Sequence, residues 1–180
     1  MNTFSPSPWS NGLVTMTNIG LVIIFGVMAY LCYRYFSYSN IASYQIIFWI
    51  VMVILVISVL SSVALMPRGV STNEKGITVH LLLKKIDIPA EEIESISAFP
   101  ANTKTIRVIG IGGLFGNVGL FSNEEIGKFS CYVTDFSKSY VISRKGKRPI
   151  VVSVADPTIF NGYKVVNSDN INSRSQQNLK

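Results

Sequence analysis

Six cations fall into two groups that could contact phosphate. They are Lys84 and Lys85 in the first group, and Arg144, Lys145, Lys147 and Arg148 in the second. Cations on a hairpin turn can meet anionic lipid head groups without an ordered pocket, at about 1 kcal/mol for each Lys or Arg near the membrane. A solvated hairpin with no ligand, and contact with an acidic protein, stay open as alternatives. Aromatic residues do not interleave the second group, so base stacking is unavailable and nucleic acid is disfavoured.

A glycine-rich segment at residues 110–119 raises the question of a nucleotide site, because glycine turns let backbone amides approach phosphate. A dinucleotide fingerprint that began at Gly110 and Gly112 would need another glycine at position 115, where the chain has Phe115. No GK[ST] sequence follows for a P-loop, and no helical pattern follows either. We therefore expect these glycines to serve strand bends, bulges and tight turns.

Metal, redox and acid–base chemistry find little support in the sequence. His80 is the single histidine and falls in a predicted strand with no second predictable ligand. Cys131 falls on the apolar face of another predicted strand, as a buried small hydrophobe does. Glu91, Glu92 and Glu94 straddle a turn and a strand start, where solvated carboxylates are ordinary. The sequence therefore predicts no catalytic, metal or cofactor site, and a protein that is not an enzyme.

These residues lie in a region of short β-branched and aromatic runs, from about residue 76 to residue 163, which predicts an antiparallel β domain. We expect about seven strands, at 77–83, 86–88, 93–99, 105–111, 129–134, 140–143 and 150–154. Alternation in 129–134 puts Phe129, Cys131 and Val133 on a core face and leaves the other face wetter. Residues 144–149 should form a hairpin turn in which Gly146 supplies a positive φ.

The end of the β domain carries a helix signal. Asp156 followed by Pro157 predicts an N-cap acceptor and a proline in the first helical position. A short terminal helix should place Ile159, Phe160 and Tyr163 over one end of a barrel. Residues 167–180 are rich in Ser, Asn and Gln without apolar periodicity, which predicts a disordered tail.

The first third of the chain holds two uncharged apolar stretches, at residues 13–33 and 46–66, and all ten carboxylates come later. At about 1.5 Å rise per residue, each can span a hydrocarbon core of about 30 Å. No Lys or Arg precedes Leu13 and no small-x-small site follows, so a cleaved signal peptide is disfavoured. The stretches predict an antiparallel transmembrane hairpin, in which Gly20 and Gly26 would pack the helix pair.

Orientation follows from the cations near the helix ends. Arg34 stands in the connecting loop, whereas Arg68 and Lys75 follow the second stretch. Positive charge favours the cytoplasmic side, so we expect both termini in the cytoplasm of a bacterium, with the hairpin in its inner membrane. Cys32 in a helix and Cys131 in the β domain could not pair in this topology, which suits a reducing compartment.

About seven strands closed by a terminal helix is the pleckstrin-homology (PH) architecture, and four segments resemble bacterial PH domain proteins. They are residues 86–96, which include the sequence IPAEEI; the glycine-bearing residues 107–119; residues 125–129; and residues 154–160. The resemblance covers about residues 70–166 and implies a PH-like barrel. Many members of that family also carry transmembrane helices. A shared fold implies no particular activity.

The sequence thus predicts an N-terminal tail (1–12), a transmembrane helical hairpin (13–66), a PH-like domain (70–166) and a C-terminal tail (167–180). Two hypotheses of function remain. In the first, the chain is a non-enzymatic membrane-anchored binding or self-assembly module that presents a small barrel at the membrane surface. In the second, it is an accessory subunit of a membrane transport or secretion complex and works through its hairpin. The expected partners are the membrane, anionic lipid head groups, and an unidentified protein or second copy.

Overall fold

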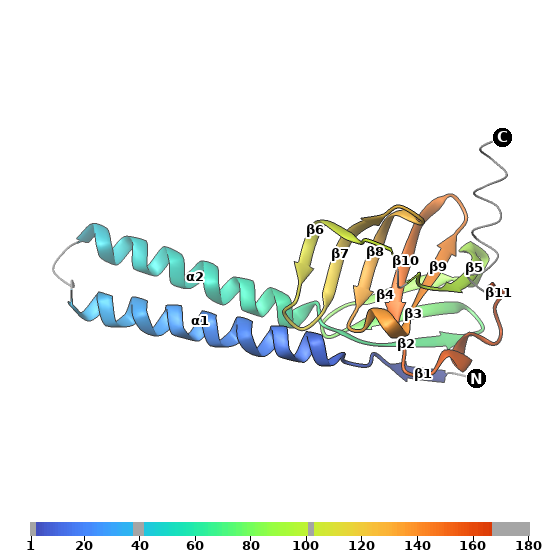
Figure 1. Cartoon of the computed structure of the whole chain (residues 1–180), viewed down its shortest axis with the longest axis horizontal. Coiled ribbons are helices and arrows are strands. Elements are labelled where there is room, and N and C mark those ends of the chain that lie inside the picture. The colour runs from blue at the N-terminus through green and yellow to red at the C-terminus, as the bar shows by residue number, and fades with distance from the viewer. Residues whose placement is uncertain (1–2, 38–41, 101–102, 167–180) are drawn as a thin grey trace.

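The computed structural model describes residues 3–37, 42–100 and 103–166. Two long helices lie side by side, and a β-rich domain stands at one end of the pair (Figure 1). Helix α1 spans Asn11–Ser37 and helix α2 spans Ala42–Ala64. Both helices are long and apolar enough to cross a membrane. The predicted tail at residues 167–180 lies outside the described residues.

The helix ends follow from local hydrogen bonding. Ser10 caps α1, because its side-chain Oγ accepts from the Leu13 amide at 3.1 Å. Ser58 and Ser62 of α2 donate back to the carbonyls of Ile54 and Ser58, at 2.8 and 2.9 Å, so these hydroxyls are satisfied inside the helix. At the other end of the pair, the rings of Tyr35 and Phe48 lie 4.5 Å apart. The helices therefore contact each other through aromatic side chains where the chain turns back.

The β domain contains two sheets. The four-stranded sheet has the order β1-β2-β3-β4, with β1 at Thr3–Pro6, β2 at Pro67–Asn73, β3 at Gly76–Leu81 and β4 at Lys85–Pro89. The seven-stranded sheet has the order β11-β5-β9-β10-β8-β7-β6, with β5 at Ile93–Ala98, β6 at Ile106–Gly112, β7 at Asn117–Asn123, β8 at Gly127–Val133, β9 at Ser139–Arg144, β10 at Lys147–Ser153 and β11 at Val165–Val166. Neighbours are antiparallel except β8 with β10 and β5 with β11.

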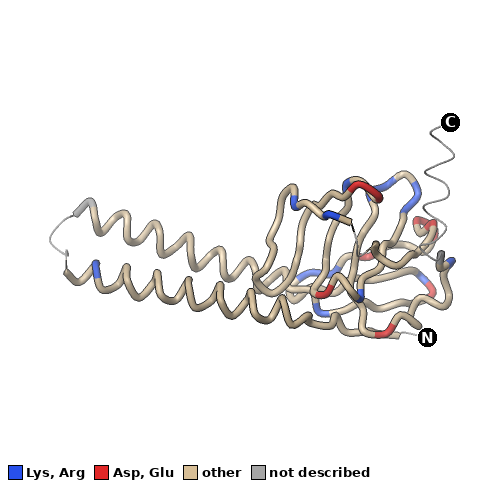
Figure 2. Tube along the Cα trace, viewed as in Figure 1, with Lys and Arg blue, Asp and Glu red and all other residues tan. Residues whose placement is uncertain are grey.

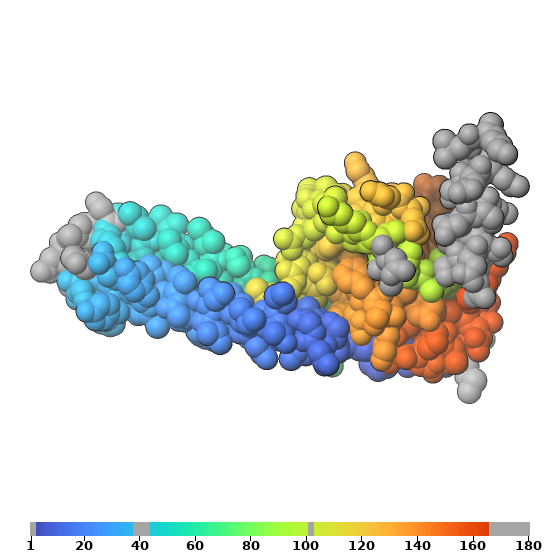
Figure 3. Space-filling view, in the orientation of Figure 1, coloured from blue at the N-terminus to red at the C-terminus, as the bar shows by residue number. Residues whose placement is uncertain are grey.

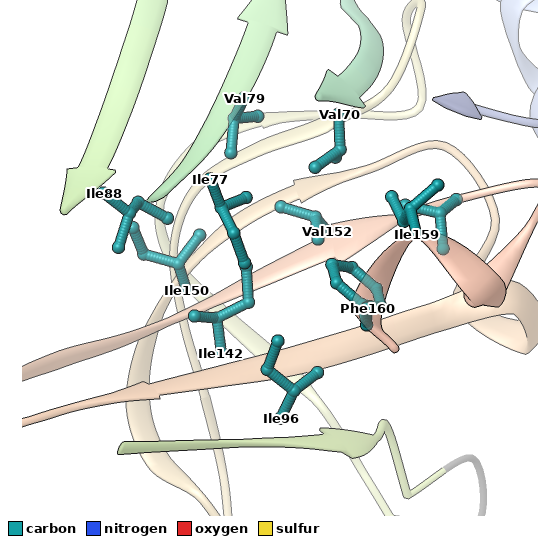
Figure 4. Packing of buried hydrophobic residues seen from close by; sticks show 11 residues of the cluster. Val70, Ile77, Val79, Ile88, Ile96, Ile142, Ile150, Val152, Ile159 and Phe160 are labelled. Carbon is teal, nitrogen blue, oxygen red and sulfur yellow. The ribbon is translucent and has the colours of Figure 1, made fainter. Parts of the chain in front are cut away.

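The main core lies between the two sheets (Figure 4). Val70, Ile77, Val79 and Ile88 of the four-stranded sheet meet side chains of the seven-stranded sheet, among them Ile96, Ile142, Ile150 and Val152. A second cluster occupies the opposite face of the larger sheet, where Phe129, Cys131 and Val133 are fully buried, as the alternation predicted. The alternate side chains of β8, which face the main core, were predicted to lie on a wetter face. Instead, Tyr132 packs against the main core and Thr134 is buried. The central strands of the larger sheet are therefore covered on both faces.

The prediction of about seven strands missed the two-residue β11 and three longer strands, β1, β2 and β7. Strand β1 lies in the segment that we expected to be a tail, and it pairs with β2 from Thr3 opposite Thr72 to Pro6 opposite Gly69. Prolines and glycines made all three segments resemble turns. In β6 and β7 the glycines allow close approach: a Cβ on Gly119 would meet the carbonyl oxygen of Ile109, and one on Gly110 would meet that of Val118. The glycine-rich segment thus serves a close strand pair.

The predicted barrel-capping helix is absent from the described residues, and the two sheets do not close into a barrel. The N-cap prediction itself holds, since Asp156 Oδ1 accepts from the Thr158 amide at 2.9 Å. The cap leads into a single 3₁₀ turn, Pro157–Phe160, which buries Ile159 and Phe160. Gly162 and the β-branched pair of β11 then favour an extended chain over a continued helix. Two further 3₁₀ turns lie at Ala90–Glu92 and Phe136–Lys138.

Candidate membrane-facing site

A hydrogen-bonded arm attaches α1 to the β domain. After β1, the Ser7 amide donates to the Arg68 carbonyl at 3.0 Å, and the Ser7 hydroxyl donates to the Ser153 carbonyl at the same distance. The Thr134 hydroxyl donates to the Pro8 carbonyl at 2.6 Å. Because these bonds reach both sheets, the start of α1 is tied directly to the domain.

The other helix is attached through the turn between β3 and β4. The amides of Leu82 and Leu83 donate to the carbonyls of Met66 and Ala64, at 3.0 and 3.1 Å. The last carbonyls of a helix lack partners within it, so the Leu83 bond satisfies the end of α2, and the Leu82 bond holds the residues that follow it. They also place Leu83, which is 79% exposed, and the exposed Lys84 and Lys85 beside that helix end. The first predicted group of cations therefore lies where α2 meets the domain.

A third attachment joins the β6–β7 turn to α1. The buried Thr17 hydroxyl donates to the Gly113 carbonyl at 3.1 Å and accepts from the Phe115 amide at 3.2 Å. One turn further along α1, the side chain of Leu114 packs over Gly20, where an added Cβ would lie 3.5 Å from Leu114 Cδ1. Gly20 thus packs against this turn, contrary to its predicted role in the helix pair. The turn lies alongside the apolar stretch of residues 13–33.

Strand β6 forms the edge of the seven-stranded sheet that lies nearest the helices (Figure 1). The strand runs across the direction of the helix axes. Its exposed apolar side chains are Ile106, Val108 and Ile109, and Arg107 between them is also exposed. An unpaired apolar edge in water is a site for association. The domain therefore presents apolar and basic side chains at its helix-side end.

The second predicted group of cations lies elsewhere, on the β9–β10 hairpin. Gly146 has a φ of 62°, so it supplies the predicted positive φ. Lys147 Nζ lies 2.6 Å from Glu92 Oε1, and an Arg144 guanidinium nitrogen lies 3.9 Å from the other oxygen of the same carboxylate. Glu92, which we expected to be solvated, thus offsets part of the charge of the hairpin. Lys145 and Arg148 are exposed.

The structure does not bring the two groups of cations together. Strands β10 and β9 stand three and four places from β6 in the sheet order. At about 4.8 Å between neighbouring strands, the hairpin lies about 14 to 19 Å further from the helices than β6 does. The Debye length at physiological ionic strength is about 8 Å. Attraction of the hairpin to a membrane surface at the level of β6 would therefore be screened. Figure 2 shows the cations of the domain spread over both ends.

Comparison with known protein families settles the class of the domain. Residues 68–166 match the family model of the bacterial PH domain. The chain belongs to the bacterial PH domain family. No curated protein and no solved structure matches the chain. The matched region begins in β2 and ends with β11, which confirms the resemblance seen in the sequence. It leaves out β1 and both helices.

The candidate reactive groups of this bacterial PH domain are engaged in structural contacts. His80 Nε2 lies 2.7 Å from the Ser71 hydroxyl. Burial and the nearby Lys85 charge lower the pKa of His80, while Asp87 acts in the opposite direction. Burial raises the pKa of the Cys131 thiol, so the thiolate that would react or bind metal is disfavoured. Among the described residues, no three His, Cys, Asp or Glu side chains are grouped to hold a metal ion.

An open pocket of about 430 Å³ lies near the start of β1, on the side of the PH domain away from the helices (Figure 1). Its polar groups largely bond one another. The hydroxyls of Thr3 and Thr72 lie 2.7 Å apart, and the Tyr163 hydroxyl donates to the Asn73 carbonyl at 3.3 Å. Burial raises the pKa of Tyr163, which keeps that hydroxyl protonated. These groups hold the strand ends together.

The sequence did not reveal the attachments at the helix-side end. Thr17 was one polar residue in an apolar stretch, and such a hydroxyl usually bonds back to its own helix. Leu114 and Phe115 stand between glycines, which was a signal of a tight turn with exposed apolar side chains. The spacing of the glycines in residues 110–119 did not indicate that this turn would contact α1. A contact between residues about 100 positions apart depends on the folded sheet.

Proposed function

We propose that this protein is a non-enzymatic, membrane-anchored binding module whose PH domain is held in a fixed orientation at the membrane surface. The observation that carries the proposal is the threefold attachment of the domain to its helices, through the N-terminal arm, the β3–β4 turn and the β6–β7 turn. A domain that only needed tethering would require one flexible linker.

Membrane insertion of the helices is supported by their exposed surfaces. In each helix, only 11% of an apolar segment of 18 residues is buried within the protein. Exposed side chains include Ile23 and Phe25 of α1 and Ile50 and Ile54 of α2. Apolar surface of this extent is stable when it contacts lipid, at about 25 cal/mol for each Å² removed from water. We therefore propose that both helices span a bacterial inner membrane.

We further propose that the PH domain and both termini are cytoplasmic. Arg34 lies near the end of α1 that is distant from the domain, whereas Arg68, Lys84 and Lys85 lie where the helices meet the domain. The attachment of the β3–β4 turn to the end of α2 supports counting Lys84 and Lys85 as juxtamembrane charges. Juxtamembrane Lys and Arg favour the cytoplasmic side.

The binding partner is proposed to be a protein or a second copy that adds a strand or helix to an open sheet edge. Among the described residues, β4 is an edge strand of the smaller sheet, and the sheets are not closed. Unpaired strand edges supply backbone donors and acceptors for an added strand. Strand β4 is exposed at Lys85, Asp87 and Pro89, so a partner can reach it.

Deleting the helices would not test the proposal cleanly, because β1 belongs to the four-stranded sheet and precedes α1. A photoreactive amino acid placed in the full chain is a sharper test. We expect crosslinking in native membranes at position 87 on β4, and much less at the matched exposed position 54 on α2. The reverse pattern would support the accessory-subunit hypothesis. A lack of any protein crosslink at either position would contradict both.

A further inference from the structure

A row of side chains, apolar except for Ser130, runs across the seven-stranded sheet and beyond the main core. Cross-strand partners share one face of a sheet. The register joins, in order, Ile96, Ile142, Ile150, Ser130, Leu120 and Ile109. The first three side chains are buried under the four-stranded sheet, Leu120 is half-buried, and Ile109 is 72% exposed. The inner face of the larger sheet thus extends past the sheet that covers it.

The uncovered end of this face is an overhang made by Ile106, Ile109 and Leu120. Ile106 belongs to the same face, because it pairs with Ser122, two residues from Leu120. A bulge between Arg107 and Ile109 adds Val108 without moving Ile106 to the other face. Strand β6, which carries two of these side chains, lies above the domain-side end of the helices (Figure 3).

The overhang is fixed at this level by the β6–β7 turn. Thr17 accepts from the Phe115 amide at 3.2 Å, and Leu114 packs over Gly20 within the apolar stretch of α1. The rings of Phe115 and Trp9 lie 6.5 Å apart, and aromatic side chains of this kind favour the membrane interface. Since the turn lies where α1 enters the membrane, the strand that leads into it lies at the head-group level.

The cations around the overhang outnumber the carboxylates, since three cations border it and the adjacent β7–β8 turn carries the exposed Glu124 and Glu125. Lys128 lies on the same face, because it pairs with Ser122 on β7. Lys104 precedes β6, and both lysines are exposed, as is Arg107. An apolar surface with a basic rim is the composition of segments that lie in the interface of anionic membranes.

We propose that the overhang rests on the leaflet from which the helices emerge, with Ile106 and Ile109 among the glycerol and upper acyl groups of lipids. The cations Lys104, Arg107 and Lys128 then meet lipid phosphate. The unpaired N–H and C=O groups of β6 stay at the hydrated head-group level, where water satisfies them. This inference rests on the proposed membrane insertion of α1 and α2. It gives β6 a lipid partner, whereas a strand partner would add to β4.

A second copy of the chain is the rival occupant of the overhang. Edge-to-edge pairing of two β6 strands would bury the same side chains. However, the free edge of β6 faces along the helices (Figure 1). A partner domain added there would occupy space that lipid fills beside the helices. The geometry therefore favours lipid.

Spin labels in the full chain test the proposal. The chain carries Cys32→Ser and is reconstituted in vesicles of phosphatidylethanolamine and phosphatidylglycerol; the fully buried Cys131 is retained because it does not label. Single labels are placed through Ile109→Cys, through Ile54→Cys on α2, and through Val165→Cys. Val165 is the matched control, an exposed aliphatic residue on β11 at the other edge of the same sheet. Collision of each label is measured with oxygen, which partitions into lipid, and with a water-soluble nickel chelate.

We expect the label at position 109 to collide with the nickel chelate several-fold less than the label at position 165, and with oxygen more. Equal nickel access at positions 109 and 165, with position 54 still in lipid, would overturn the overhang proposal and leave membrane anchoring intact. Nickel access at position 54 would overturn both. Protection of position 109 from both reagents, with spin coupling between chains, would assign the overhang to a second copy and would overturn lipid contact.

Discussion

At the scale of single residues, Thr17 is the side chain that joins the PH domain to the body of α1. Its hydroxyl both donates and accepts across the contact, to Gly113 and from Phe115. One side chain thus satisfies two backbone groups of the β6–β7 turn, the Gly113 carbonyl and the Phe115 amide. Thr15 on the same helix donates only to the Asn11 carbonyl of its own helix and is exposed. Within one turn of α1, Thr15 therefore bonds only its own helix, whereas Thr17 bonds the β6–β7 turn.

We predict that Thr17→Val loosens the β6–β7 turn without unfolding the protein. Valine keeps the shape but removes both hydrogen bonds, each worth about 1 kcal/mol. Hydrogen exchange of the Phe115 amide in lipid nanodiscs should become about thirtyfold faster, since the two bonds together are worth about 2 kcal/mol and about 1.4 kcal/mol is a factor of ten. Thr15→Val is the control and should leave that exchange unchanged. Equal protection in wild type and Thr17→Val would show that packing of Leu114 alone holds the turn.

We also predict an acid-sensitive contribution from His80. Burial and the Lys85 charge hold the pKa of His80 in the folded chain below its ordinary value of 6.5. The unfolded chain therefore takes up this proton more readily, and the contribution to stability is complete above pH 6.5 and is lost as pH falls through the folded pKa. The melting temperature in detergent should fall over this range. His80→Gln should flatten that part of the profile, and an unchanged slope in the variant would contradict the assignment.

At the scale of elements, the β6–β7 hairpin depends on glycine at the point where its strands approach most closely. Gly110 and Gly119 are register partners with φ of 140° and 141°. A side chain at either position would meet a backbone carbonyl of the other strand. The hairpin that carries the overhang is therefore tied to these two glycines.

We predict that Gly119→Ala destabilises the protein by about 3 kcal/mol, because it combines an unfavourable φ with a backbone clash. Gly127→Ala is the control: its φ of 72° is also positive, but an added Cβ there meets open space. Gly127→Ala should therefore lower the free energy of unfolding by only about 1 kcal/mol. Chemical denaturation in detergent measures both free energies. Similar losses for the two variants would mean that the strands shift apart at no extra cost.

Prediction from sequence succeeded for elements defined by their own residues. The apolar stretches, the buried face of β8 and the Asp156 cap each depend on nearby residues, and each is present in the structure. Strand β1 could not be predicted from four residues that end in a proline, because it exists through pairing with β2. The attachments of Thr17 and Leu83 likewise depend on residues distant in sequence. The site at the helix-side end was therefore not predictable from local pattern, except for Lys84 and Lys85.

At the scale of the whole molecule, we expect the position of the cations to decide the orientation of the proposed transmembrane hairpin. Arg68, Lys84 and Lys85 lie close to the ends of the helices, whereas the hairpin cations lie about 14 to 19 Å beyond β6 by strand spacing. Charges near the helix ends dominate orientation, and more distant ones contribute little. Lys145, Lys147 and Arg148, three of the four hairpin cations, carry the same charge as the helix-end set and therefore provide a controlled comparison.

We predict that a reporter fused after Lys180 is active in the cytoplasm and that a tag at Ser39 is reached from outside. Replacing Arg68, Lys84 and Lys85 with glutamine should produce a mixed population, because Arg34 then remains beside its helix end while the domain side loses the three cations at its junction with the helices. Replacing Lys145, Lys147 and Arg148 removes the same charge and should leave the orientation unchanged. If the hairpin variant inverts as readily as the helix-end variant, net charge of the domain rather than charge at the helix ends sets the topology. Retention of one orientation in both variants would instead assign it to the N-terminal arm and its bonds to the folded domain.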